Sequence, residues 1–392
     1  MTDTPGRFVA AWSLRSDTVY LNHGSFGPPP RCVRQARQTW IDRLDEQPMD
    51  FFVRRLEPSL AQAKDALARF VGSRTDDLAF VENATAGMNL VAASVPLTAT
   101  DEVLLTDHEY GAVRRIWERA CRRAGATLRT VALPGTFDDP DETVDAIVAA
   151  VTDHTRLLVV SHITSPTAVI LPVAAICRRV RQRGVRVCID GPHAVAMLPL
   201  DLAALECDYY TASCHKWLCA PFGSGFVYVH SRWEQEVEPA VLSWGRVQPA
   251  VPQRWTDELV WTGTRDPSAY LSVPSAIEFL EGVPLDGFRR QTHELVCYAR
   301  DRIVERTGRA PLVADAANFG RPQWFGSMIA LPLPPGESDP LQRALWERFS
   351  IEIPVVDFGG GRHLRVSCHL YNTREHVDRL VAALATLLDE GL

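Results

Sequence analysis

The chain has 392 residues, 46% hydrophobic and 23% charged, with a formal net charge of −7. A chain of this length usually forms a large domain and a smaller one, each with its own core. The acidic balance and the lack of basic runs argue against nucleic acid as a partner. No segment is apolar for long enough to cross a bilayer, and the first residues lack a leader pattern, so we expect no membrane contact and a cytoplasmic location.

The cysteines and lysines carry more information than the averages. The nine cysteines include no CxxC pair and no Cys/His metal spacing, which is typical of reduced thiols in the cytoplasm and predicts no metal centre. Only two basic residues are lysines, Lys64 and Lys216, and the others are arginines. Arginine cannot replace lysine where chemistry needs a neutral amine. Lys64 lies in a stretch with helical apolar spacing, which predicts a solvated helix face, so Lys216 is the lysine to explain.

Short apolar runs alternate with helix-patterned segments through the first two thirds of the chain. This alternation predicts a mainly parallel, doubly wound α/β sheet covered on both faces. Sheets of this kind bind ligands beyond the carboxyl ends of their strands. The expected strands are residues 78–81, 102–106, 157–160, 185–189 and 225–229.

The pattern changes after Asp266-Pro267. A long helical region is expected to reach Arg306, followed by strands at 328–333, 351–353 and 363–367. We therefore predict an N-terminal arm (1–20), a large domain (21–265) and a smaller C-terminal α/β domain (266–392).

Two predicted strand ends carry reactive groups. Asp190 follows an apolar strand before a Gly-Pro turn, where its carboxylate can keep a pyridine nitrogen protonated. Ser213, His215 and Lys216 follow a second extended run, where the first two can bind phosphate and the lysine can form an imine with an aldehyde. The alternatives are a helix-capping Asp and a lysine in a structural ion pair. The scarcity of lysine and the pairing with Asp190 weigh against the second.

A third element joins a strand to a helix at Asn83, Ala84 and Thr85. Free N–H groups at such a helix start can cradle a phosphate. The alternative is helix capping alone.

Together these elements resemble the class V aminotransferase family of fold-type-I pyridoxal-phosphate enzymes. The similarity extends from about Leu21 to Thr373. The matching segments are 21–27, 47–51, 104–111, 161–162, 165–167, 214–217, 263–266 and 365–373.

The resemblance implies the cofactor pyridoxal 5′-phosphate and a role for each matching residue. Asp190 would pair with the pyridine nitrogen, His193 would lie near the ring's phenolic oxygen, and Tyr110 would stack on the ring. Ala84, Thr85, Ser213 and His215 would hold the phosphate. Thr264 would reach the phosphate of a neighbouring subunit, which implies a homodimer with shared sites. Taken without the family, Tyr110 is an ordinary buried tyrosine and Thr264 a turn residue.

The resemblance also implies a substrate side of the site, for an amino-acid-like small molecule. Arg365 would bind the α-carboxylate, since its planar fork suits bidentate contact, although it could also be a surface arginine. Asn22 and His23 would lie in a segment that folds over the site, and Ser165 would lie beside the substrate.

Within the family the chain most resembles an epimerase acting at Cα. Epimerisation requires a second acid besides Lys216, for which Tyr110 and His23 are the candidates. A carbon–sulfur lyase, an aminotransferase and a cyclase remain open, because matched cofactor motifs do not determine the substrate. A persulfide-forming desulfurase is disfavoured, since no cysteine occurs between Cys297 and Cys368. A non-catalytic binding protein is disfavoured because Asp190, Lys216 and Arg365 are all present.

Overall fold

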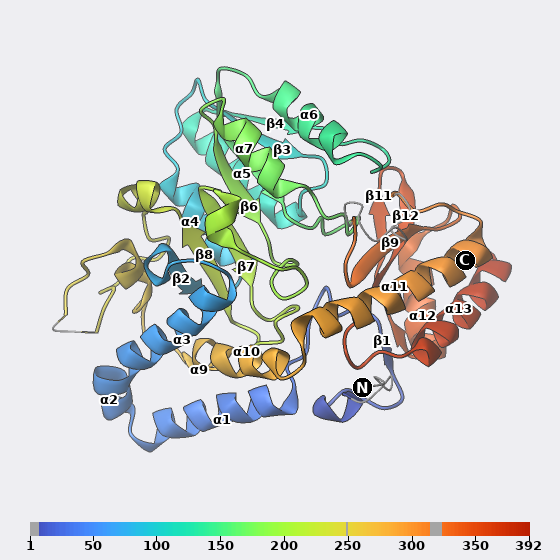
Figure 1. Cartoon of the computed structure of the whole chain (residues 1–392), viewed down its shortest axis with the longest axis horizontal. Coiled ribbons are helices and arrows are strands. Elements are labelled where there is room, and N and C mark those ends of the chain that lie inside the picture. The colour runs from blue at the N-terminus through green and yellow to red at the C-terminus, as the bar shows by residue number, and fades with distance from the viewer. Residues whose placement is uncertain (1–7, 248–249, 314–323) are drawn as a thin grey trace.

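The large domain is built on a seven-stranded sheet (Figure 1). A computed structural model of the chain describes residues 8–247, 250–313 and 324–392. The strands are parallel except β8, which runs antiparallel to both of its neighbours. In sheet order they are β2 (Leu78–Val81), β8 (Gly225–Val229), β7 (Tyr209–Ser213), β6 (Arg186–Asp190), β5 (Thr155–Ser161), β3 (Glu102–Thr106) and β4 (Thr127–Val131). The predicted mainly parallel α/β fold is confirmed.

Both faces of this sheet are buried. Along β3, Leu104 packs into one core cluster, whereas Val103 and Leu105 pack into the other, because successive side chains in a strand point to opposite faces. Helices α4 (Ala84–Ser94) and α5 (Gly111–Ala124) cover one face, and α6 (Pro140–Ala150) and α7 (Val173–Arg181) cover the other. The short helix α8 (Leu202–Leu205) precedes β7.

Further helices lie before β2 and between β8 and β9. The region expected as one long helix is divided into three, because Pro274 begins one helix and Pro284 caps another, and proline cannot continue a preceding helix. The N-terminal helical elements are α1 (Arg31–Glu46), α2 (Pro48–Asp50), a π-helical turn (Phe51–Arg55), α3 (Leu56–Phe70) and 3₁₀ turns at Val9–Ala11 and Thr75–Asp77. The later ones are 3₁₀ turns at Ser231–Glu236 and Trp255–Leu259, then α9 (Ser268–Leu271), α10 (Val273–Glu281) and α11 (Leu285–Thr307).

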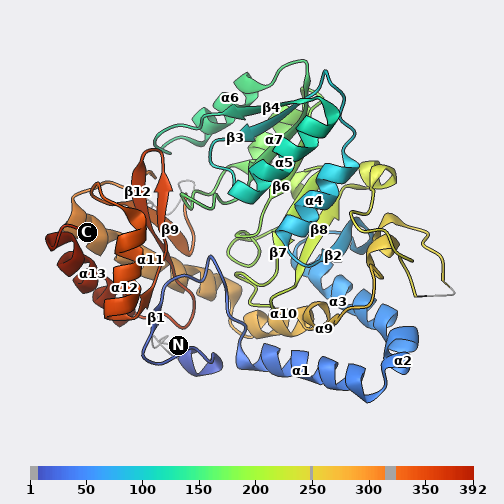
Figure 2. The same ribbon diagram turned by 180° about the vertical axis from the view of Figure 1, so that it is seen from behind.

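The C-terminal region forms a smaller antiparallel sheet in the order β11-β12-β9. Its elements are β9 (Met328–Pro332), α12 (Ser338–Phe349), β10 (Ile351–Glu352), β11 (Val355–Phe358), β12 (Gly361–Ser367) and α13 (Arg374–Asp389). The N-terminal strand β1 (Val19–Tyr20) pairs in parallel with β10, and Asn22 bridges to Ser367. The N-terminal segment therefore lies against the small domain, as Figure 2 shows from behind.

Three strands were not predicted from the sequence: the two-residue β1 and the edge strands β4 and β11. Edge strands bury less surface, so β4 shows no run of buried residues.

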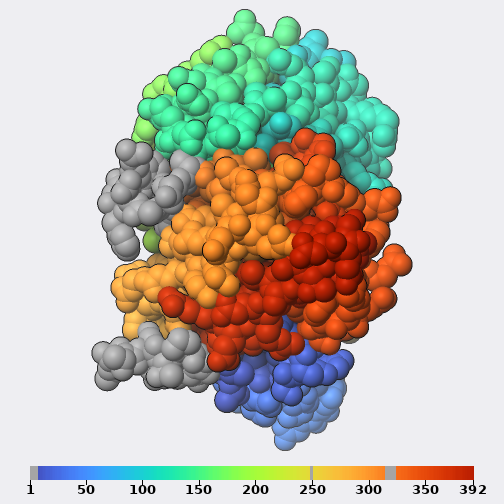
Figure 3. Space-filling model, turned by 90° about the vertical axis from the view of Figure 1, so that its right-hand side faces the viewer, coloured from blue at the N-terminus to red at the C-terminus, as the bar shows by residue number. Residues whose placement is uncertain are grey.

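In Figure 3 the orange and red C-terminal elements lie between the green part of the large domain and the blue N-terminal helices. In the part of the chain that the structure describes, no helix has both the length and the apolarity to cross a bilayer.

Candidate active site

A cavity of about 430 Å³ lies between the carboxyl edge of the large sheet, the N-terminal segment and β12. It brings together most of the residues predicted from sequence, although they come from widely separated segments. The predicted residues that line it are Ala84, Thr85, Tyr110, Ser165, Asp190, His193, Ser213, His215, Lys216 and Arg365.

The floor of the cavity is set by strand register. Ser161 and Asp190 are the last residues of β5 and β6 and lie opposite each other, and Thr211 lies opposite Asp190 on β7. The Thr211 hydroxyl donates to Asp190 Oδ1 at 2.9 Å. Burial raises the pKa of the Asp190 carboxyl, against the opposing effects of Thr211 and Lys216. A cationic pyridinium N–H at this position would supply the partner that the buried carboxylate lacks.

Lys216 extends into the same cavity. Its Nζ lies 3.0 Å from His193 Nε2, and the Trp217 indole donates to His193 Nδ1 at 3.3 Å. Because an indole N–H can only donate, the remaining proton of a neutral His193 is on Nε2 and faces the amine. Burial lowers the pKa of Lys216, with a further contribution from Arg365, while Asp190 opposes the shift. A lysine with a lowered pKa is available as a neutral nucleophile and base.

A phosphate cradle lies at the start of α4. Asn83 caps the helix by accepting from the Ala86 N–H, and Ser213 Oγ accepts from the Ala84 N–H at 3.0 Å. Thr85 lines the cavity, and its N–H belongs to the first turn, which has no intrahelical acceptor. His215 Nδ1 is buried without a hydrogen-bond partner among the described residues. These groups fit a phosphate, whose charge would also stabilise the helix N-terminus.

Arg365 enters the cavity from the small domain. Its guanidinium donates to Ser165 O at 2.7 Å and to the hydroxyl of Ser25 at 2.6 Å. Burial lowers its pKa to about 10. Its Nε has no partner within the described ranges, so a buried donor remains for a bound carboxylate.

Tyr110 caps α5 at the mouth of the cavity, and its side chain is 50% exposed. Phe26 is also exposed, and it lines the cavity from the N-terminal segment. An aromatic ring at this mouth can stack on a flat cofactor.

Asn22, His23 and Thr264 are not among the residues that line the cavity. Asn22 donates to Glu352 Oε1, and Thr264 lies on an exposed turn. His23 is fully buried, and its Nε2 lies 3.1 Å from the Lys216 carbonyl oxygen. A carbonyl can only accept, so His23 Nε2 donates and Nδ1 accepts from the Tyr371 hydroxyl at 2.9 Å. The ring therefore holds the backbone of Lys216 and faces away from the cavity.

His23 also belongs to a buried cluster with Cys219 and His369, whose donor atoms lie within 4.8 Å of one another. Cys219 Sγ lies 3.4 Å from His369 Nε2. The two imidazole rings stack, with centroids 4.1 Å apart and planes at 18°. Ring nitrogens offer their lone pairs in the ring plane, so stacked rings do not direct both toward one ion. The arrangement favours a hydrogen-bonded cluster over a metal centre.

The sequence reasoning missed Glu109, a buried carboxyl beside the floor of the cavity. It accepts from the Ser161 N–H at 3.1 Å, the Ser161 hydroxyl at 2.6 Å and the Thr106 hydroxyl at 2.7 Å. No cation pairs with it in the described part of the chain. Burial raises its pKa to about 7. The position of Glu109 just after β3 was the available signal, but only the register of β5 brings Ser161 to it.

These features fit one cofactor. A buried carboxylate, a lysine of lowered pKa and a phosphate cradle at a helix start suit a phosphorylated pyridine aldehyde. Fold and site together define a pyridoxal-phosphate-dependent enzyme of fold type I.

Comparison with known proteins specifies the family. Residues 51–380 match the family described as Aminotransferase class-V, and the chain belongs to it. It is 40% identical to an isopenicillin N epimerase of Streptomyces clavuligerus over 96% of both chains. It is 29% identical to a probable chloroplastic L-cysteine desulfhydrase of Arabidopsis thaliana, over 96% of this chain and 84% of the other. A solved structure of the protein C-DES, with glycine covalently linked to its PLP cofactor, superposes with a TM-score of 0.81 at 22% identity, covering 94% and 97% of the two chains.

The two lysines allow a direct test of the cofactor's attachment. We expect Lys216→Ala to abolish the visible absorption of the lysine-bound cofactor, because no other amine reaches this cavity among the described residues. Lys64→Ala is the matched control and should keep the spectrum. Visible spectra of the purified proteins measure this absorption. An unchanged spectrum in Lys216→Ala would contradict the attachment of the cofactor to Lys216.

Glu109→Gln should change how stability depends on pH. A folded-state pKa of about 7 lies above the usual value of 4.5, so the folded protein loses stability as pH rises from 4.5 through 7. Gln stays neutral, and its amide can donate to the Ser161 hydroxyl while its oxygen keeps the other two bonds. We expect nearly equal unfolding free energies near pH 4 and a gain for Glu109→Gln on the order of 3 kcal/mol near pH 8.

Urea unfolding at the two pH values measures this difference. The exposed Glu118→Gln on α5 is the matched control, and it should show no such dependence. A pH-independent difference for Glu109→Gln would show that its carboxyl does not hold the proton.

Proposed function

We propose that the enzyme inverts the Cα configuration of an amino acid or of a small molecule that contains one, as an epimerase. The observation that carries this proposal is the 40% identity to an isopenicillin N epimerase over 96% of both chains. A match over this length spans the segments that form the cavity as well as the rest of the fold.

The reaction would be divided among Arg365, Lys216, Asp190 and Tyr110. Arg365 would bind the substrate carboxylate, with Ser25 and Ser165 holding its guanidinium in place. Bound PLP withdraws electrons from Cα and so makes its proton acidic. Lys216 would remove or return that proton on its own face of the substrate, since burial lowers the pKa of its amine. Asp190 would keep the pyridine nitrogen protonated.

Inversion needs a second proton carrier on the other face, and we assign it to Tyr110. Tyr110 and Lys216 line the same cavity, whereas His23 does not. Burial lowers the pKa of His23 to about 3, so its ring stays neutral. We therefore assign His23 a positioning role through the Lys216 carbonyl.

Carbon–sulfur elimination is the second candidate. The 29% identity to a probable L-cysteine desulfhydrase favours it over transamination or cyclisation. No cysteine is among the described residues that line the cavity, so a persulfide on the enzyme is not part of this candidate.

We also infer that the enzyme works as a cytoplasmic homodimer. Several large apolar side chains are exposed near the cavity mouth and on the segment that precedes Thr264. Exposed apolar patches of this kind mark interaction surfaces. A second copy would cover them and would bring its Thr264 to the phosphate. The exposed side chains are Phe26, Tyr110, Phe222, Val241, Leu242 and Trp244.

Reaction in D₂O separates the candidate activities. An epimerase should introduce deuterium at Cα and invert the configuration, which NMR and chiral chromatography measure on a panel of amino acids and small peptides. Pyruvate and ammonia from cysteine or cystine would indicate a lyase, and accumulation of pyridoxamine phosphate an aminotransferase. Either result without inversion of any substrate contradicts the epimerase proposal.

Tyr110→Phe should separate proton exchange from inversion. The variant keeps the ring but loses the hydroxyl, so we expect inversion to fall by about 100-fold or more while deuterium exchange on the Lys216 face persists. Tyr298→Phe on α11, outside the cavity, is the matched control. If exchange and inversion fall together, or neither falls, Tyr110 is not the second proton carrier.

A further inference from the structure

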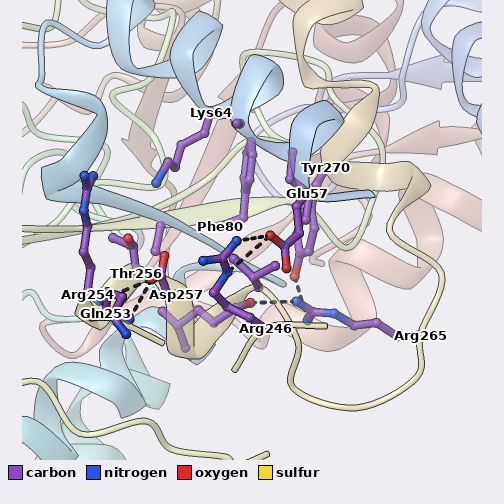
Figure 4. A pocket seen from close by; sticks show the side chains of 15 residues that line it. Glu57, Lys64, Phe80, Arg246, Gln253, Arg254, Thr256, Asp257, Arg265 and Tyr270 are labelled. Carbon is purple, nitrogen blue, oxygen red and sulfur yellow. Dashed lines mark hydrogen bonds and ion pairs between the residues drawn. The ribbon is translucent and has the colours of Figure 1, made fainter. Parts of the chain in front are cut away.

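A second cavity, of about 380 Å³, lies beside the edge strand β2 and shares no lining residue with the active-site cavity. Its walls come from α3, from β2, from Arg246, from residues 253–260, from Arg265 and from Tyr270 of α9 (Figure 4). Ligand pockets typically begin at about 300 Å³, so this cavity can hold a small organic molecule.

One wall of this cavity is apolar and aromatic. Phe80 and Tyr270 stack with ring centroids 5.1 Å apart and planes at 13°. Leu60 and Leu259 extend the same wall. Such a surface fits a flat or aliphatic carbon group.

Most charged groups around the cavity are already paired. Arg246 pairs with Glu57, Arg254 pairs with Asp76, and Arg265 pairs with Glu82. Asp257 accepts from the backbone N–H groups of Gln253 and Arg254.

Lys64 is the exception. It extends from α3 toward the cavity, and no dashed line reaches it in Figure 4. Its ammonium makes no hydrogen bond or ion pair with the residues that the structure describes. It is half-buried, which corrects the expected solvated helix face. Burial lowers its pKa, against the opposing effects of Asp76, Asp257 and Asp65, and Arg254 lowers it further.

This arrangement costs stability, because a partly desolvated ammonium without a partner is unfavourable. A stabilising role therefore does not explain the second lysine of the chain. A ligand that places a hydrogen-bond acceptor directly against the ammonium does.

We propose that this cavity binds a small monocarboxylate, with its carboxylate on Lys64 and its carbon body against Phe80 and Leu60. A single negative charge is favoured over a phosphate dianion, because the carboxylates of Asp76 and Asp257 face the same ammonium. The site is separate from the active site, so the proposal does not depend on the reaction that the enzyme catalyses.

The composition of the chain makes the test direct. Reductive ¹³C-methylation keeps the charge of an amine. The hydride reductant would also reduce an imine between Lys216 and the cofactor, so the resonance of Lys64 is identified as the one that Lys64→Met lacks. We expect phenylacetate to shift this resonance with saturation, and calorimetry on unmethylated holoenzyme to give the same Kd.

Two variants complete the design. Lys64→Met should weaken phenylacetate binding by about tenfold or more, since it removes a charge-assisted contact, and should fold at least as stably as the parent. Arg69→Met removes one charge from an exposed position on the same helix and should bind as the parent does. The absence of a saturating shift, unchanged binding in Lys64→Met or equal weakening in Arg69→Met would overturn the site. Inorganic phosphate binding as tightly as phenylacetate would overturn the monocarboxylate class.

Discussion

The active site depends on burying an amine and a carboxylate close together at one edge of a parallel sheet. Lys216 and Asp190 are each shifted toward their neutral forms by burial, and each partly offsets the shift of the other. A cofactor that offers a cationic ring nitrogen to one and an aldehyde to the other satisfies both. The surrounding contacts, from Thr211 to Trp217, hold these two groups in position.

A second constraint is the close approach of the N-terminal segment to the Lys216 loop. A Cβ on Gly27 would lie 2.6 Å from the Lys216 carbonyl oxygen and 2.7 Å from His23 Nε2, so only glycine fits there. His23 donates to the same carbonyl, and Ser25 accepts from Arg365. One short segment therefore connects the cofactor lysine to the arginine of the small domain. Any movement of the small domain would change both ends of the substrate site together.

The two lysines lie in cavities of different chemistry. Lys216 faces a polar cavity in which His215 Nδ1 and Arg365 Nε have no hydrogen-bond partner among the described residues. Lys64 faces an apolar cavity in which the other charges are already paired. The same property, an amine whose pKa is lowered by burial, thus supports a proposed covalent role at one site and a proposed ionic role at the other.

The sequence by itself determined the large-domain fold, most of its strands and a set of candidate residues that line one cavity. Strand periodicity is a local property, and Asp190 and Ser213 end strands whose limits can be read directly, with Lys216 three residues further on. The edge strands β4 and β11 were not predicted, because too few of their residues are buried to give an apolar pattern. Only the tertiary structure decided that Glu109 meets Ser161, that His23 faces the Lys216 backbone instead of the cavity, and that Lys64 lines a pocket. Each of these depends on side chains from distant segments that meet only when the strands align and the segments pack, which no local pattern records.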